Sequence, residues 1–483
     1  MMFIDREAEL SFFNHILQRQ YPGPAQFILL YGRRRVGKTH LLRYWAEQSG
    51  VPYTYWAAEK EPSAAQRRKL FAKVDNRPVS QAPLLGSWME TWEAIANLIG
   101  QEKHILILDE LPYAAEGDPA MLSSLQHAWD QRFQHSQLIL VICGSQVQSM
   151  ETLQHRQSPL CGRFTGQWHL QPLPFYTLKT FFPNWSAAER VAAYAILGGI
   201  PAYYQWLDPA LSLVENIRQR ILFPGSMFLG EPTLLLYDEV REPQSYLAIL
   251  KAIGSGCHTL DEISNECLIG KNNLSAYLVR LQGLKFIERR LPATIPTPQR
   301  RRSRQGRYHI SNPYFRFFFR FIAPFHETIP FDLDPVMGKV QQELGAFVGQ
   351  TAFEELAQQW VRQQAKQGVL SFVPERIGSH WSRSVQIDVV GVNWSAQQLL
   401  LGECKWGEQP IDKQTVRELL ERRGPQIVEK MGIDPHRWQV TYLYFARSGS
   451  TPAAQAYAQE IGIGLVDLEE MTAVLEQIPD NAT

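Results

Sequence analysis

Apolar and polar positions alternate along the chain in patterns that change twice. From residue 1 to about 170, short apolar runs of strand length alternate with longer stretches of helical spacing. Such runs separated by helices are typical of a parallel α/β sheet. The sequence predicts these strands at Phe27–Tyr31, Pro52–Trp56, Ile105–Leu108 and Leu138–Cys143. The next segment, to about residue 239, is helical and aromatic, and prolines interrupt it.

The rest of the chain predicts two more folded parts. Helical spacing at Tyr246–Ile253, after Thr259 and at Asn272–Leu284 precedes two short strand-like runs, Phe286–Leu291 and Arg307–Ile310. Three helices followed by a hairpin describe a winged helix-turn-helix. Beyond residue 340 the α/β pattern returns, with strands predicted at Ser384–Val392, Gln398–Cys404 and Gln439–Phe445.

Composition is that of an ordinary globular protein. Apolar residues make up 45% of the chain and charged residues 20%, which excludes the disordered, collagen-like and coiled-coil classes. The five cysteines are scattered, without the spacing of a disulfide framework or of a CxxC metal site. The first residues are charged, and no run of about 18 apolar residues occurs. We therefore expect a cytoplasmic protein without a membrane partner.

The equal totals of 48 basic and 48 acidic residues conceal an uneven distribution. Residues 1–240 carry 21 basic and 22 acidic groups, residues 241–325 carry 14 and 5, and residues 326–483 carry 13 and 21. The middle segment is therefore the part whose charge favours a phosphate backbone. The same backbone would repel the acidic C-terminal part, unless a metal ion or the basic neighbour offsets its charge.

A phosphate-binding motif, G-x-x-x-x-G-K-T, directly follows a predicted strand and reads Gly32-Arg33-Arg34-Arg35-Val36-Gly37-Lys38-Thr39. Gly32 and Gly37 allow a tight loop whose amides face phosphate oxygens, so the segment is predicted to bind ATP. Lys38 would reach the β- and γ-phosphates, and the Thr39 hydroxyl would ligate Mg²⁺. The alternative is a chance glycine-rich turn, which the succession of strand, loop and helix argues against.

Two further strands predict the other half of the nucleotide site. One apolar strand ends in Asp109, predicted to hold the metal, and Glu110, predicted to orient or deprotonate the attacking water. The next ends before Ser145, which is either a sensor of the γ-phosphate or a turn residue. Arg163 follows a glycine in a position suited to an arginine finger, with a plain surface arginine as the alternative. A finger would act across a subunit boundary, so a homo-oligomer forming with ATP is expected.

These motifs resemble the archaeal-type ATPases of the AAA+/STAND group of P-loop ATPases. The segments that carry the resemblance are Phe3–Leu10, the phosphate loop, Leu108–Tyr113 and Leu197–Tyr203. The resemblance implies that residues 172–239 form a helical lid over the nucleotide, with Pro201 in a Gly-Pro motif of that lid. The simpler interpretation of the Pro201 segment is a helix-ending turn.

The predicted hairpin of the middle segment contains an arginine-rich loop. Its guanidinium groups belong to Arg300, Arg301, Arg302, Arg304 and Arg307. As the wing of a winged helix, this loop would follow DNA phosphates. Winged helices also serve protein contacts, and a charged loop is often only solvated, so both alternatives remain open.

The C-terminal strands carry a second set of carboxylates. Asp388 lies among apolar neighbours, and Glu403 and Lys405 project to one side of the next strand. Two carboxylates can hold one Mg²⁺ while a lysine helps to activate water or stabilises charge on a phosphate. This arrangement resembles the restriction-endonuclease-like PD-(D/E)XK fold, in which Glu354, or the adjacent Glu355, would complete the metal shell. The alternatives are an exposed strand pair and a nuclease fold retained for docking.

The favoured hypothesis is an ATPase whose ATP state controls a DNA-binding winged helix and a Mg²⁺-dependent nuclease-like domain. Its predicted catalytic residues are Lys38, Glu110, Asp388, Glu403 and Lys405. The rival is a STAND-like signalling ATPase whose C-terminal domain docks protein or nucleic acid without cutting. In both, the α/β chain divides into a P-loop core with a parallel sheet (1–171), a lid (172–239), a winged helix-turn-helix (240–325) and a PD-(D/E)XK nuclease-like α/β domain (340–483).

Overall fold

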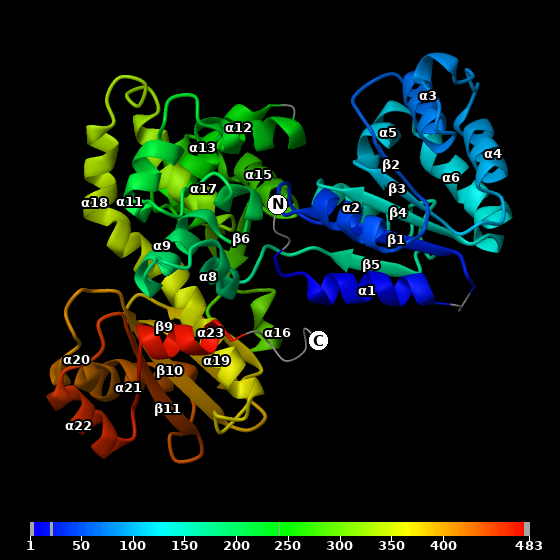
Figure 1. Cartoon of the computed structure of the whole chain (residues 1–483). Coiled ribbons are helices and arrows are strands. Elements are labelled where there is room, and N and C mark those ends of the chain that lie inside the picture. The colour runs from blue at the N-terminus through cyan, green and yellow to red at the C-terminus, as the bar shows by residue number, and fades with distance from the viewer. Residues whose placement is uncertain (1–3, 20–22, 241, 478–483) are drawn as a thin grey trace. The chain divides into compact units, whose positions relative to one another are not determined.

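The computed structural model describes residues 4–19, 23–240 and 242–477. Backbone contacts divide them into two units (Figure 1). The first comprises the described residues up to Leu173 together with Ile200–Tyr203, and the second comprises Pro174–Gly199 and the residues from Tyr204 onward. Phe3 and the last residues of the predicted 340–483 domain lie outside the described residues. Among the described helices, none has both the length and the apolar character needed to cross a membrane.

The first unit is built on a parallel sheet of strand order β2-β3-β4-β1-β5. Its strands are β1 (Gln26–Tyr31), β2 (Tyr53–Ala57), β3 (His104–Asp109), β4 (Leu138–Gly144) and β5 (Gly166–His169). The four predicted strands are confirmed to within one residue at either end, because continuous apolar runs suit strands buried on both faces. The short edge strand β5 was missed, since half of its residues are exposed. Because β4 lies between β1 and β3, the carboxyl ends of these three strands meet at one edge.

Helices cover both faces of this sheet, as Figure 1 shows. Side chains of β1 alternate: Ile28 and Leu30 join the core under one face, and Phe27 and Leu29 join the core under the other. The first face is covered by α1 (Glu7–Gln18) and α2 (Lys38–Gln48). The second is covered by α3 (Ser63–Val74), α4 (Trp88–Ile99), α5 (Leu111–Gly117), α6 (Ala120–Gln131) and α7 (Val147–Thr152).

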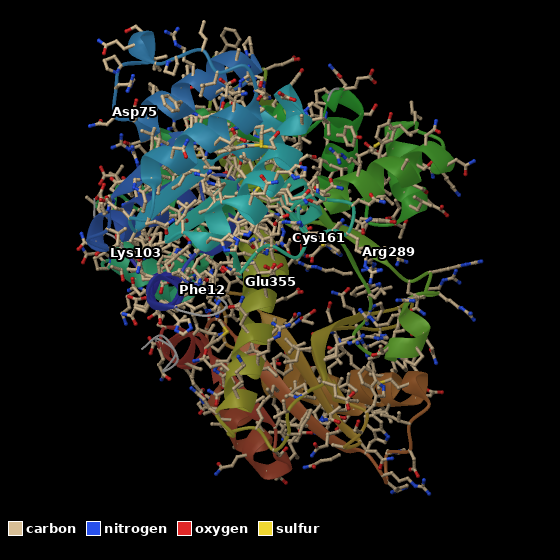
Figure 2. All side chains as sticks on the ribbon, turned by 90° about the vertical axis from the view of Figure 1, so that its right-hand side faces the viewer. Phe12, Asp75, Lys103, Cys161, Arg289 and Glu355 are labelled. Atoms are coloured by element: carbon tan, nitrogen blue, oxygen red, sulfur yellow. The ribbon has the colours of Figure 1, made fainter. Side chains whose placement is uncertain are left out.

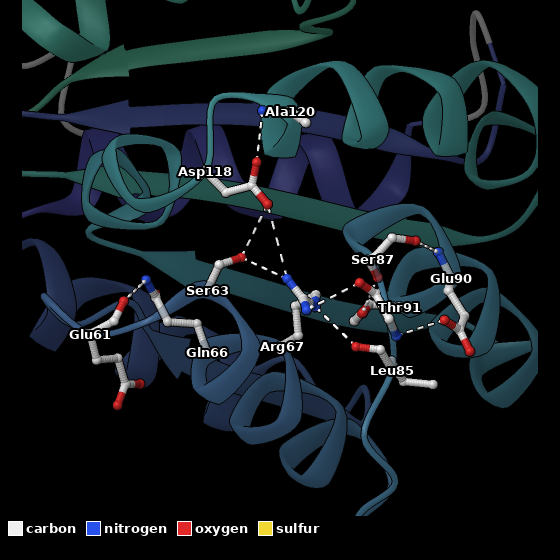
Figure 3. Close-up of polar contacts among 11 residues, drawn as sticks. Glu61, Ser63, Gln66, Arg67, Leu85, Ser87, Glu90, Thr91, Asp118 and Ala120 are labelled. Carbon is white, nitrogen blue, oxygen red and sulfur yellow. Dashed lines mark hydrogen bonds and ion pairs between the residues drawn. The ribbon is translucent and has the colours of Figure 1, made fainter.

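A buried arginine on α3 fixes the outer layer of this second face (Figure 3). The Arg67 guanidinium donates to the carbonyl oxygens of Leu85 and Gly86, at 3.2 and 3.3 Å, and to the Ser63 hydroxyl at 2.8 Å. These carbonyls precede Ser87, the N-cap of α4. Because the buried Arg67 side chain donates to both of these carbonyl groups, it holds the entry to α4 against α3.

The second unit begins with helices that include α8 (Leu178–Phe181), α9 (Ala187–Leu197), α11 (Leu213–Asn216) and α12 (Met227–Glu239). A capping box between Ser186 and Glu189 starts α9, and Gly198, at φ 61°, ends it. Pro201 then begins the short helix α10 (Pro201–Tyr204). The Leu197–Tyr203 segment therefore ends one helix and starts another.

Three helices and an antiparallel strand pair follow, as predicted for the middle segment. They are α13 (Pro243–Gly254), α14 (Leu260–Cys267), α15 (Lys271–Gly283), β6 (Ile287–Arg290) and β7 (Arg307–Ile310), with the helical turn α16 (Thr297–Arg300) inside the loop. A capping box starts α14, because the side chains of Thr259 and Glu262 each accept from the backbone N–H group of the other residue. After β7, the aromatic residues of α17 (Pro313–Phe317) and of the π-helical turn Phe318–Ile322 are buried.

The C-terminal part contains a mixed sheet of order β12-β11-β10-β9-β8. Its strands are β8 (Arg376–Trp381), β9 (Gln386–Asn393), β10 (Gln398–Lys405), β11 (Gln439–Ala446) and β12 (Gly464–Asp467). Its helices are α18 (Asp334–Val348), α19 (Glu354–Lys366), α20 (Lys413–Glu418), α21 (Gly424–Met431), α22 (Pro452–Ile461) and α23 (Leu468–Leu475). The three predicted strands are confirmed. The polar β8 and the short β12 were missed because neither has a long apolar run. Strand β9 runs antiparallel to β10, with Val389 opposite Gly402, which brings Asp388 next to Glu403.

Candidate nucleotide site and carboxylate cluster

The predicted phosphate loop joins β1 to α2, and its two glycines are required by the backbone. A Cβ at Gly32 would lie 2.5 Å from the carbonyl oxygen of Leu170, so no side chain fits there. Gly37 has φ 100°, in the left-handed region that glycine tolerates best. The buried Lys38 Nζ donates to the carbonyl oxygens of Gly32 and Arg33, at 2.8 and 3.0 Å. Its amine therefore lies inside the loop.

The other residues of the phosphate loop differ in exposure, and a residue outside the motif, Arg6, supports the loop. Val36 is buried in the core, so only its backbone can face a ligand, whereas Arg34 is exposed and Arg33 and Arg35 are half-buried. The buried Arg6 donates to the carbonyl oxygen of Val36 at 3.1 Å. Arg6 lies in the Phe3–Leu10 segment of the family resemblance, but nothing local in the sequence indicates its contact with a residue 30 positions along the chain.

Thr39 and Asp109 meet directly. The Thr39 hydroxyl donates to Asp109 Oδ2 at 2.7 Å, and the Tyr55 hydroxyl donates to the same oxygen at 2.7 Å. The backbone N–H of Glu110 donates to the other carboxylate oxygen at 2.9 Å. Burial and the nearby Asp109 raise the pKa of Tyr55, which keeps its hydroxyl protonated as a donor. Tyr55 carries no motif and was not predicted; only the parallel pairing of β2 with β3 brings it to this carboxylate.

The structure brings Ser145 and Glu110 together. Glu110 has a left-handed backbone, with φ 51°, and its Oε2 accepts from the backbone N–H and the hydroxyl of Ser145, at 3.1 and 3.0 Å. This contact follows from the strand order, because β4 lies beside β3. The end of β4 therefore fixes the side chain predicted to orient water.

Arg163 is engaged within its own unit. Its guanidinium forms two hydrogen bonds with the Asp130 carboxylate, at 2.8 and 2.6 Å, and donates to the carbonyl oxygens of Pro159 and Cys161. The bonded arginine lowers the pKa of Asp130. A finger role would require this ion pair to open.

The residues around the loop fit a magnesium nucleotide. Loop amides and the Lys38 amine supply donors for phosphate oxygens. Thr39 and Asp109 supply two oxygen atoms, 2.7 Å apart, and Mg²⁺ is commonly held by one or two such protein oxygens together with phosphates and water. The Cγ of Pro201 lies 3.8 Å from the position that a Cβ at Gly37 would take. The predicted lid motif therefore contacts the phosphate loop within the first unit.

In the second unit, the predicted C-terminal residues meet where β9 and β10 lie side by side. Asp388 Oδ2 accepts from the backbone N–H of Cys404 at 3.0 Å. Glu403 is 2% exposed and accepts from Arg423 Nη1 at 2.8 Å through Oε2, whereas its Oε1 is buried without a hydrogen-bond partner among the described residues. Lys405 is two residues beyond Glu403 and shares its face of β10. No sequence motif indicated Arg423.

Burial raises the pKa of every acid in this cluster. It raises the pKa of Glu354 to about 9 and that of Glu403 to about 7, and repulsion from Asp388 adds to both. Burial also raises the pKa of Asp388. Glu355, labelled on α19 in Figure 2, differs: Arg316 and Arg290 outweigh the effect of burial and lower its pKa. Glu354, rather than its neighbour, therefore belongs with the carboxylate cluster.

A cavity of about 1060 Å³ opens at the cluster, lined among others by Glu354, Asp388, Glu403, Lys405 and Arg423. Within the described ranges, no three His, Cys, Asp or Glu side chains stand close enough to hold a metal ion. The carboxylate oxygens are donors that Mg²⁺ prefers, and the unpartnered Glu403 Oε1 suits a cation. Arg423 would have to release Oε2 for both oxygens of Glu403 to bind one.

A model of the ATPase domain found predominantly in Archaea matches residues 3–206. An uncharacterized protein of Methanocaldococcus jannaschii, MJECL04, is 33% identical over 409 residues, which are 84% of this chain and 88% of that protein. The chain belongs to this archaeal-type ATPase family. A second model, of archaeal and bacterial proteins of unknown function, matches residues 318–419 of this archaeal-type ATPase.

Other similarities of this archaeal-type ATPase are shorter or more distant. An uncharacterized ATP-binding protein of M. jannaschii, MJ0423, is 42% identical over 52 residues, which are 11% of this chain and 81% of that protein. Among solved structures, a Walker-type ATPase of Pyrococcus abyssi has a TM-score of 0.49 and 21% identity, covering 66% of this chain and 96% of that chain. An ORC2 protein of Aeropyrum pernix has a TM-score of 0.43 and 14% identity, covering 70% and 94%.

Proposed function

We propose that the chain binds and hydrolyses ATP at the phosphate loop, and that its nucleotide state controls a DNA-directed module. The observation that carries the first part is the meeting of Thr39 with Asp109 beside the loop that encloses Lys38. In this proposal Lys38 binds phosphate oxygens, Thr39 and Asp109 hold Mg²⁺, and Glu110 orients the attacking water. Bound Mg²⁺ would neutralise phosphate charge.

In this proposal each of four domains has its own function. Residues 1–171 form the nucleotide-binding core, and residues 172–239 form its lid. Residues 240–325 form a winged helix-turn-helix, and residues 340–483 form a PD-(D/E)XK-like domain. The contact of Pro201 with the phosphate loop supports the lid, because a ligand in the loop would alter the position of this segment.

The winged helix is proposed to contact DNA through α15 and the arginine loop. Among the exposed residues of α15 are Lys271, Asn272 and Asn273, whose side chains can donate to phosphates and base edges. In the loop, Arg300 donates to the carbonyl oxygen of Pro292 at 3.0 Å, and Arg307 lies 5.3 Å from the centre of the Trp381 ring. The other loop arginines, Arg301, Arg302 and Arg304, are exposed and would meet the phosphate backbone.

The carboxylate cluster is proposed to hydrolyse a phosphodiester. Asp388 and Glu403 would hold Mg²⁺, Glu354 would join them only by moving closer, and Lys405 would stabilise charge on the phosphate. Water adds to phosphorus, the bond from phosphorus to the leaving sugar oxygen breaks, and that oxygen takes a proton. The buried, mutually repelling carboxylates at an open cavity support this site, because a cation would remove their repulsion.

One observation favours a second candidate, a STAND-like signalling ATPase with a docking domain that does not cut. The ion pair between Arg423 and Glu403 occupies one of the carboxylate oxygens that a metal would need. A permanent ion pair would make the cluster structural, and the cavity would then receive a partner instead of a scissile phosphate.

Plasmid cleavage separates the two candidates. Full-length protein is incubated with plasmid, Mg²⁺ and ATP, beside Asp388→Asn and the exposed control Glu460→Gln. The nuclease proposal expects nicked or linear DNA from the wild type and the control, and intact DNA from Asp388→Asn. Equal DNA survival in all three samples would favour the docking candidate.

ATP turnover tests the nucleotide site. Lys38→Ala should lower phosphate release from ATP by at least about a hundredfold, because it removes a cation placed for the transferring phosphate. Lys73→Ala, an exposed lysine on α3 of the same unit, should leave turnover unchanged. Normal ATP binding and turnover in Lys38→Ala would contradict the assignment of the loop.

A further inference from the structure

A second, smaller cavity in the second unit is lined by basic side chains. Its volume is about 320 Å³. Its walls include residues of the middle segment, of α17 with the following turn, and of β8 and β9. Its basic side chains are those of Arg290, Arg307, Arg316, Arg320, His258, His309 and His380. Gln350, Glu354 and Gln386 line this cavity as well as the larger one, so it adjoins the carboxylate cluster.

The acids around this basic cavity do not match its arginines one to one. Glu355 pairs with both Arg290 and Arg316, at 2.8 Å each. Glu343 pairs with Arg320 at 2.9 Å, and the half-exposed Glu288 also reaches Arg290. Arg307 has no carboxylate partner among the described residues and instead lies over the Trp381 ring. Among the described residues that line the cavity there are four guanidinium groups and one carboxyl group, that of Glu354, so arginines dominate the charge of the wall.

The walls of the cavity are fixed to each other, so the site is preformed. The backbone N–H of Ala293 donates to the carbonyl oxygen of Ser379 at 2.8 Å, and Trp381 Nε1 donates to that of Gln305 at 3.0 Å. Burial and then Arg290 lower the pKa of His309 to about 2, so the surrounding charge stays with the guanidinium groups. A preformed site loses little entropy when it binds a ligand.

We propose that this basic cavity binds a phosphate monoester, such as the terminal phosphate of a nucleic-acid strand. A monoester carries about 1.5 to 2 negative charges at pH 7, more than a backbone diester, and its oxygens suit arginine forks. A terminal phosphate held there would lie beside Asp388 and Glu403. The strand as source rests on the proposed DNA-directed function, whereas a free phosphate would use the same side chains.

Binding of inorganic phosphate tests this site without any cleavage. Equilibrium dialysis with radiolabelled phosphate is done in EDTA on full-length Lys38→Ala, in which the phosphate loop is impaired. We expect one phosphate per chain. Adding Arg307→Gln should weaken binding at least tenfold, and Arg307→Lys should restore part of it. Adding the exposed control Arg437→Gln should change nothing.

Melting curves establish that each variant is folded. No binding in Lys38→Ala, or equal affinity with and without Arg307→Gln, would overturn the proposal. Competing oligonucleotides identify the source: displacement by a 5′-phosphorylated strand, but not by its 5′-hydroxyl twin, assigns the strand end. If neither oligonucleotide displaces the labelled phosphate, the natural ligand is a small phosphate. If both displace it equally, the proposed preference for a monoester is overturned. Because Mg²⁺ and cutting play no part, failure here would leave the plasmid result standing, and the converse also holds.

Discussion

The nucleotide site and the carboxylate cluster both place acids near the ends of strands, but they surround those acids differently. Asp109 is buried and accepts hydrogen bonds from neutral donors, among them two hydroxyls and one backbone N–H. Glu403 is equally buried, yet one oxygen faces the Arg423 guanidinium and the other faces no donor. After burial, repulsion from another acid, Asp388, is the main cause that raises the pKa of Glu403.

This difference separates a carboxylate that is held in place by neutral donors from carboxylates whose mutual repulsion must be offset. Neutral donors fix the Asp109 carboxylate and leave its negative charge to a cation. In the cluster, burial and repulsion favour the protonated acids, so protons, Arg423 or a metal ion must offset the charge.

The largest effect is expected from Arg423→Gln, which removes the partner of Glu403. Leaving a buried carboxylate without its partner should lower the free energy of unfolding at pH 8 by about 2 kcal/mol. Arg422→Gln is the matched control, because that neighbouring arginine is 67% exposed. Urea unfolding in EDTA measures both. If Arg423→Gln and Arg422→Gln lower the free energy of unfolding equally, Arg423 does not stabilise the charge of Glu403. The carboxylate cluster would then not need a positive charge, and it would not differ from the nucleotide site in this respect.

The pH dependence of stability, counted per pH unit and per titrating group, should be next in size. The folded pKa values of Glu354 and Glu403, about 9 and about 7, lie above the ordinary glutamate value. Their stabilising effect is therefore present at low pH and is lost as the pH rises from about 4.5 through these values. Metal-free protein should lose up to about 1.4 kcal/mol per pH unit for each titrating group.

Unfolding free energies at pH 6 and pH 8.5 measure that slope, and Glu354→Gln should flatten it. Glu355→Gln is the matched control, because its pKa is lowered, so it should destabilise the protein without flattening the slope between these two pH values. Addition of Mg²⁺ at pH 8.5 should restore stability to the wild type. If the unfolding free energy of Glu354→Gln falls with pH as steeply as that of the wild type, Glu354 is not one of the titrating groups.

The same contrast explains what the sequence could predict. The phosphate loop and the Asp109 strand are contiguous patterns, so their residues and strand limits were predicted closely. Tyr55 and Arg423 were missed, because strand order and helix packing bring them to the carboxylates and no local pattern marks them. The arginine loop shows the same limit: the sequence gives five similar arginines, and only the contacts of Arg300 and Arg307 distinguish them from the exposed ones.

The smallest effect is expected at the nucleotide site, from Tyr55→Phe. Loss of one neutral hydrogen bond to Asp109, worth about 1 kcal/mol, should lower ATP turnover about fivefold and leave the fold intact. Tyr53→Phe is the control, because its hydroxyl on the same strand contacts the exposed Glu47 instead. If Tyr55 positions the carboxylate for a cation, the Mg²⁺ concentration that gives half-maximal turnover should also rise. A fall in turnover at unchanged Mg²⁺ dependence would show that Tyr55 acts on the fold of the site and not on its metal, and the Thr39 hydroxyl and the Glu110 N–H would then suffice to position Asp109 for the cation.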